Sequence, residues 1–167
     1  MVEKDTIFSS KIKSKGIFSF KDFYQFMYDW QTSELELELA EEKYVEKLSG
    51  DTKEIVIEWK GKRKVTDYFQ FEIKTKYRIT QLKNIEITQN GKKIKTNEGD
   101  AEIAVKGTLI RDYKGKFETN ALNKFLRSIY EKWVISSRID QFEEKLIGNC
   151  DEILSQAKAY LDLEGKR

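Results

Sequence analysis

The chain has 167 residues, the length of one ordinary domain, and its 39% apolar and 13% aromatic content is enough for a packed core. Its 31 basic and 29 acidic side chains leave a net charge of +2, which gives little long-range attraction to nucleic acid or anionic lipid. Histidine is absent and Cys150 is the only cysteine, which excludes an intrachain disulfide and a histidine-activated nucleophile. We therefore expect a single domain over residues 1–167 that is not an enzyme and has no catalytic residues, metal site or cofactor.

The sequence carries no membrane-spanning or secretion signal. No apolar run reaches the roughly 18 residues that a bilayer span needs. The N-terminal segment Met1–Asp5 is charged and is not followed by the apolar core of a signal peptide. We therefore predict a cytoplasmic protein without a membrane span.

The N-terminal part of the chain predicts a strand followed by a helix. Apolar residues among small and charged ones favour a first strand between Thr6 and Ser14. Ser19, with Asp22 three residues later, has the pattern of a helix N-cap. The apolar residues behind it recur at helical spacing and predict a helix over 20–32 with at least one buried side; they are Phe20, Phe23, Met27 and Trp30.

From Glu34 onward the apolar period changes from 3.6 to two, which predicts a run of antiparallel strands with one apolar face each. We expect strands at 35–48, 55–59, 69–79, 85–87 and 101–109, with a short return at Ile94. Turns are predicted at Ser49–Thr52, Lys60–Lys64, Asn90–Gly91 and Gly99–Asp100, and bulges near Ala40 and Gly107. Together with the N-terminal strand this makes six or seven strands.

After Gly115 the helical period returns, and one apolar stripe runs from Leu122 to Leu161. Ser136–Ser137 either kinks this long helical region or caps a second helix. We therefore predict an α+β fold, in which a curved antiparallel sheet of about six to seven strands packs on a long C-terminal helix and a shorter N-terminal helix as a two-layer sandwich.

This order of elements resembles the helix-grip fold of the START and Bet v 1-like superfamily, although the single short N-terminal helix departs from that fold's usual helix pair. The resemblance implies a cavity between sheet and helix that holds a hydrophobic ligand, or a groove that binds a client. The segments Phe18–Trp30 and Tyr160–Gly165 look like those of small uncharacterised archaeal proteins, which implies a prokaryotic cytosol and no particular activity.

Three functions follow from these patterns. The first is a non-enzymatic binding module that holds a hydrophobic small molecule or lipid; its expected lining is Phe23, Met27, Trp30, Phe71, Tyr77, Phe125 and Trp133. The second is a protein–protein interaction or structural protein, which could self-associate as a homodimer, acting through the C-terminal helix or a sheet edge. The third is a weak nucleic-acid binder using basic hairpin tips at 60–64 and 91–95. Nucleic acid is the least favoured partner, because solvated tips explain the same lysines.

Overall fold

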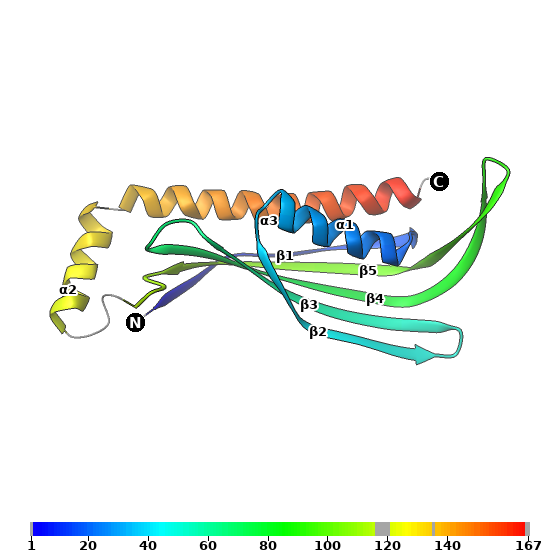
Figure 1. Ribbon diagram of the computed structural model, residues 1–167, viewed down its shortest axis with the longest axis horizontal. Coiled ribbons are helices and arrows are strands. Elements are labelled where there is room, and N and C mark those ends of the chain that lie inside the picture. Colours follow the sequence, from blue (N-terminus) through cyan, green and yellow to red (C-terminus); the bar gives the residue numbers. More distant parts are fainter. Residues whose placement is uncertain (1, 116–120, 135, 166–167) are drawn as a thin grey trace.

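The computed structural model describes residues 2–115, 121–134 and 136–165. In these residues the fold is α+β: a five-stranded antiparallel sheet carries α1 and α3 on one face (Figure 1). The strands are β1 (Glu3–Ile17), β2 (Glu38–Ser49), β3 (Thr52–Lys64), β4 (Phe69–Gln89) and β5 (Lys92–Arg111), in the order β1-β5-β4-β3-β2. The helices are α1 (Phe20–Ser33), α2 (Ala121–Ile129), the π-helical turn η1 (Tyr130–Val134) and α3 (Ser136–Gly165).

The predicted strand number of six to seven is wrong, because two pairs of predicted strands are each one long bent strand. The segments 69–79 and 85–87 both belong to β4, which bends at Gln81, where φ is 53° and the register shifts. Gly99 lies opposite this bend inside β5 rather than in the predicted turn. A Cβ at Gly99 would lie 3.1 Å from the Cα of Leu82, so the bent strand needs glycine as its neighbour.

The predicted hairpin tip at 60–64 is also wrong, because Gly61 lies within β3, paired with Leu39 and Ile73. An added Cβ would lie 3.0 Å from Cδ2 of Leu39, so this glycine makes room for a leucine rather than for a turn. The basic residues of the segment therefore lie on the sheet. The turns at Ser49–Thr52 and Asn90–Gly91 are confirmed, the latter with φ of 53° and 77°.

The predicted bulges lie close to their expected places. The register of β2 against β3 shifts between Glu41 and Lys43, just after the expected position at Ala40. The shift expected at Gly107 lies instead on the opposite strand, between Thr6 and Phe8 of β1. Gly107 serves close packing, because a Cβ there would lie 2.6 Å from Sγ of Cys150 on α3.

The core fills the space between the sheet and its two covering helices. Ser19 caps α1 by accepting a hydrogen bond from the Asp22 amide at 3.4 Å, as predicted. Alternate residues of β3, β4 and β5 face the helices; the fully buried ones include Ile55, Ile57, Phe71, Ile73, Ile79, Ile103 and Leu109. From α3 they meet Leu146, Cys150, Ile153 and Ala157. Burial of these side chains is the main stabilising contribution to the fold.

The C-terminal helical region divides in two, and α3 begins at Ser136. Of the two predicted alternatives for Ser136–Ser137, a kink or the start of a second helix, the second is therefore the one observed. The apolar stripe of α3 packs on the sheet, as expected, and the strands that it contacts are β1 and β5. The stripe of α2 does not continue it. In Figure 1 the yellow α2 lies beyond the end of the sheet and at a steep angle to α3.

Candidate functional site

The residues predicted to line a ligand cavity lie in two separate places. Phe23, Met27, Phe71 and Tyr77 are between 0% and 2% exposed and belong to the core between the sheet and its covering helices. Trp30 is half-buried against the same core. The remaining two, Phe125 and Trp133, lie on α2 and η1 and are 61% and 74% exposed.

Side chains occupy the space between α1 and the sheet. The Phe23 ring centroid is 6.0 Å from that of Tyr77, which is 4.9 Å from that of Trp59. Gln31, which is 0% exposed, donates from Nε2 to the Tyr77 hydroxyl at 3.0 Å. Five open hollows of about 350 to 510 Å³ lie elsewhere on the described surface, and no core residue of the predicted lining borders any of them. The internal ligand site therefore stays a prediction.

An aromatic cluster with one carboxylate closes the β2 edge of this core. Oε1 of Glu41 accepts hydrogen bonds from the Tyr24 hydroxyl at 2.8 Å and from Nε1 of Trp59 at 3.2 Å. Burial and the neighbouring Glu41 raise the pKa of Tyr24 to about 12. Because the carboxylate is occupied by two donors and the phenol keeps its proton, the arrangement supports packing rather than acid–base chemistry.

The largest departure from ordinary packing is the apolar face of α2 and η1, which we call the α2 face: Leu122, Phe125, Leu126, Ile129 and Trp133. These five side chains are 64%, 61%, 45%, 39% and 74% exposed, respectively. Their spacing of i, i+3, i+4, i+7 and i+11 places them on one side of the helical segment. A surface helix normally turns such a stripe toward the core. Here the apolar side faces outward.

The opposite, polar side of this segment is attached to the body of the molecule. Arg127 donates from Nη2 to Oε1 of Glu3 on β1 at 2.8 Å, and its Nη1 lies 3.8 Å from the buried Asp112 carboxylate. Arg111 of β5 donates from Nη1 to Oε2 of Glu131 at 3.1 Å. The side chains of Arg127 and Glu131 are only 12% and 15% exposed. These ion pairs hold the helix with its polar side inward.

Arg111 is the centre of this anchoring cluster. Besides Glu131 it contacts Asp5 at 2.6 Å and Glu3 at 2.8 Å. Burial alone would lower the pKa of Arg111, but the three carboxylates outweigh burial and raise it. The Tyr68 hydroxyl donates to Glu131, and burial together with this bond raises the pKa of Tyr68 above its usual range. The cluster is thus occupied by its own charges, so its role is to fix the helix.

One edge of the α2 face carries a cation. Lys132 is exposed and forms no ion pair within the described part of the chain, whereas Lys124 lies on the opposite, polar side and lines the hollow beside Arg127 and Glu131. The Lys132 ammonium lies 5.3 Å from the ring centroid of Trp133, beside the apolar stripe. A partner that covers the stripe therefore meets positive charge at its edge.

Sequence reasoning found the stripe of α2 but expected it to be buried, because a period shows which residues share a face and not what covers them. It missed the anchoring residues Arg111, Arg127 and Glu131. One available signal was that Arg127 and Glu131, four residues apart, share the helix side opposite the stripe.

The fold and site define an α+β protein that displays an amphipathic helix with its apolar side outward. No protein-family model, no curated protein and no solved structure matches this chain. The helix-grip and archaeal resemblances therefore stay predictions. Within the described ranges, no helix is long and apolar enough to cross a membrane, and no group of three or more His, Cys, Asp or Glu side chains could hold a metal ion.

Proposed function

We propose that this chain is a non-enzymatic docking module that binds a protein partner by placing the α2 face in an apolar groove of that partner. The observation that carries the proposal is the inverted orientation of α2 and η1. Their polar side is held inward by Arg127 and Glu131, while five large apolar side chains point outward.

The energetic argument concerns the exposed stripe. Burying one large apolar side chain contributes about 1.5–3 kcal/mol, so leaving five partly exposed is a substantial loss for a folded monomer. Contiguous exposed apolar side chains with polar neighbours mark interaction sites. The ion pairs that hold the helix outward oppose its collapse onto the body, which keeps the stripe ready for a partner.

The spacing of the stripe favours a groove in a protein over a bilayer. Helices that bind grooves use anchors at i, i+3, i+4 and i+7, which here are Leu122, Phe125, Leu126 and Ile129. Proteins that bind anionic membranes do so through clusters of about four to eight basic residues. The α2 face has only Lys132 at its edge. We therefore infer a groove with an apolar floor and an acidic group at its rim.

A second copy of this chain fits the α2 face less well. Two α2 faces packed together would leave Lys132 of each copy without an opposite charge, whereas a partner with an acidic rim supplies one. The internal hydrophobic-ligand site remains a separate prediction, and Phe125 and Trp133 are assigned here to docking.

The test uses a photo-reactive amino acid at position 126 to crosslink the partner in host cells, followed by titration of the purified partner. The variant Phe125→Ser/Trp133→Ser should bind that partner at least tenfold more weakly, since aromatic anchors dominate interface energies. The matched control, Leu48→Ser/Leu163→Ser, removes two side chains that are 79% and 68% exposed elsewhere. It should bind within twofold of the wild type.

Three results would overturn the proposal. One is an equal loss of affinity in both double variants. Another is flotation of the wild-type protein with phosphatidylglycerol vesicles that depends on Phe125 and Trp133, which would make the occupant a bilayer. The third is a concentration-dependent dimer in light scattering that the Phe125→Ser/Trp133→Ser variant abolishes.

A further inference from the structure

The middle of the outer face of the sheet, on the side away from α1 and α3, carries no covering helix (Figure 1). Strand β4 shows the division clearly. Tyr77 and Ile79 are buried beneath the helices, whereas Lys74, Lys76 and Arg78 alternate with them and are exposed on the outer side. The outer face is therefore a polar surface formed by neighbouring strands rather than by loops.

Three lysines stand side by side across this face, and we call them the lysine row: Lys106 on β5, Lys74 on β4 and Lys60 on β3. The sheet register places Lys106 opposite Lys74, and Lys74 opposite Lys60. Neighbouring strands lie about 4.8 Å apart, so the three side chains leave the sheet close together. Like charges directly opposite each other destabilise a sheet. Packing alone therefore gives no reason for the row.

The carboxylates of the outer face do not neutralise the whole row. Glu102 pairs with Lys11 and Lys13, Glu58 with Lys76, Glu54 with Arg78, and Glu72 with Lys60. Within the described ranges, Lys74 and Lys106 form no ion pair. The centre of the face therefore keeps two lysines outside any ion pair, with Glu42 and Glu58 as the carboxylates that line the hollow beside them.

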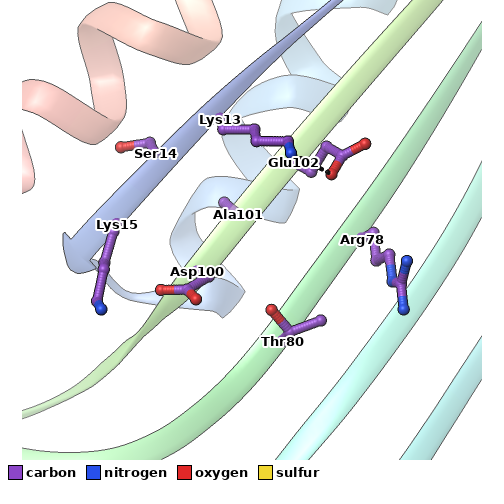
Figure 2. A pocket seen from close by; sticks show the side chains of 8 residues that line it. All are labelled: Lys13, Ser14, Lys15, Arg78, Thr80, Asp100, Ala101 and Glu102. Carbon is purple, nitrogen blue, oxygen red and sulfur yellow. Dashed lines mark ion pairs between the residues drawn. The ribbon is translucent and has the colours of Figure 1, made fainter.

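Two open hollows border these charges. One, of about 350 Å³, is lined by three lysines, Lys74, Lys76 and Lys106, and by two carboxylates, Glu42 and Glu58. The other, of about 490 Å³, lies further along the same strands, and Figure 2 shows Lys13, Lys15 and Arg78 around it, together with Asp100 and Glu102. The dashed line in Figure 2 marks the 3.9 Å pair of Lys13 with Glu102. Cations thus extend from the lysine row toward β1.

We propose that the outer face binds the sugar–phosphate backbone of double-stranded nucleic acid, with Lys74 and Lys106 contacting phosphates and Lys60 exchanging its ion pair with Glu72 for a phosphate. Backbone phosphates are a dense array of single negative charges, and adjacent lysines on a sheet are spaced to contact several of them at once. Such contacts hold the duplex without reading its sequence.

The composition of the face favours a duplex over a single strand. Proteins that bind single strands stack bases on exposed aromatic side chains. The described outer-facing residues around the lysine row are lysine, glutamate, serine, threonine and alanine, such as Ser9, Thr108 and Ala104. Trp59 also borders the hollow beside the row, but it is only 2% exposed and so offers no surface on which a base could stack. Backbone contact is the mode of recognition that these side chains can supply. The inference does not depend on the α2 face, which lies at the end of the molecule.

The test is fluorescence anisotropy of a labelled DNA duplex of about 20 base pairs titrated with the full chain. The titration is repeated at several concentrations between about 25 and 200 mM NaCl, because the affinity of phosphate contacts falls steeply over roughly this range. The wild type should bind, and more weakly as salt rises. The variant Lys74→Gln/Lys106→Gln should bind at least tenfold more weakly at low salt, and its salt slope should fall by about 2, because each lost phosphate contact lowers the slope by about 1.

The matched control, Lys21→Gln/Lys145→Gln, makes the same change of charge on exposed residues of α1 and α3 and should bind within twofold of the wild type. Urea unfolding separates an effect on binding from an effect on folding. The Lys74→Gln/Lys106→Gln variant loses a repulsion between like charges, so its urea midpoint should be no lower than that of the wild type. The proposal is overturned if no binding occurs at 25 mM NaCl, which is about the most permissive condition, or if both double variants lose affinity equally. It is also overturned if a single strand, or a phosphatidylglycerol vesicle, binds the lysine row more tightly than the duplex does.

Discussion

Arg127 on α2 donates a hydrogen bond to Glu3 on β1 at 2.8 Å, joining two residues that are 124 positions apart. The first strand of the chain therefore holds the helix that displays the α2 face. The same Glu3 carboxylate also pairs with Arg111 of the neighbouring strand β5 at 2.8 Å. The orientation of α2 thus depends on a small set of charges at the end of the sheet, and it can be tested by removing one of them.

The first prediction concerns this attachment. Replacing Arg127 with Met should release α2, because Glu3 and the buried Asp112 lose a cation while the apolar face has nothing to cover it. Removing one partner of a largely buried ion pair costs about 3 kcal/mol, which is roughly a hundredfold in the opening equilibrium. Hydrogen exchange of the α2 amides should accelerate by that factor, while the α3 amides change little. Lys124→Met, which alters only an exposed side chain, should leave the exchange of α2 unchanged, and equal exchange in the two variants would refute the anchoring role.

The second prediction concerns the contact between β5 and α3 at Gly107. A Cβ at this position would lie 2.6 Å from Sγ of Cys150, so Gly107→Ala should destabilise the protein by about 1–3 kcal/mol through overpacking. Cys150→Ala removes the obstructing sulfur and should cost about 1–2 kcal/mol by itself. The double variant should then be more stable than the sum of the single changes predicts. Urea unfolding of all four proteins measures this coupling, and strict additivity would show that the close contact is not the cause.

The sequence predicted the presence of helices and strands better than it predicted where the strands end or which residues pack against them. The helix at 20–32 and the alternating strands were found because their periods are strong. The turns at Lys60–Lys64 and Gly99–Asp100 were wrong, because Gly61 and Gly99 serve close contacts with Leu39 and Leu82, and such contacts leave no local signal. A glycine between charged residues looks the same in a hairpin tip and in a crowded strand.

The candidate surfaces show the same limit. The apolar stripe of α2 is visible in the sequence as a helical period, but its exposure depends on ion pairs that the sequence does not show. Arg111 pairs with Asp5 and Arg127 pairs with Glu3, each across more than a hundred residues of chain. The lysine row was invisible, because its members come from three strands and only the register places Lys74 beside Lys60 and Lys106. Pairing between distant segments is the information that a single sequence does not display.

The third prediction concerns the polar pair in the core. Gln31 donates to the Tyr77 hydroxyl at 3.0 Å, and both side chains are at most 2% exposed. Tyr77→Phe or Gln31→Leu should each destabilise the protein by about 1–3 kcal/mol, because each leaves a buried polar group without its partner. The double variant removes both polar groups and should cost less than either single change. Thermal and urea unfolding would show this as a favourable coupling, whereas a double variant that loses the sum of both effects would contradict it.

The last prediction concerns stability in alkali. Burial raises the pKa of the Cys150 thiol to about 12, with the nearby Asp151 adding to the effect, and the pKa of Tyr24 also rises to about 12. In the unfolded chain these groups ionise near about pH 8.5 and 10. Between those values and pH 12 the unfolded state binds fewer protons than the folded state, so stability is fully present below about pH 8.5 and falls as the pH rises.

Urea midpoints measured at intervals over this alkaline range should decline for the wild type, and the decline should be shallower in Cys150→Ala from its beginning. Tyr24→Phe should follow the wild type at first and become shallower only above about pH 10, where the unfolded phenol begins to lose its proton. The difference between variants is the informative quantity, because Tyr44, Tyr68 and Tyr77, whose pKa values are also raised by burial, are present in every protein compared. A Cys150→Ala midpoint that falls as steeply as that of the wild type would mean that the thiol is not held in its neutral form by the packing of α3 against Gly107.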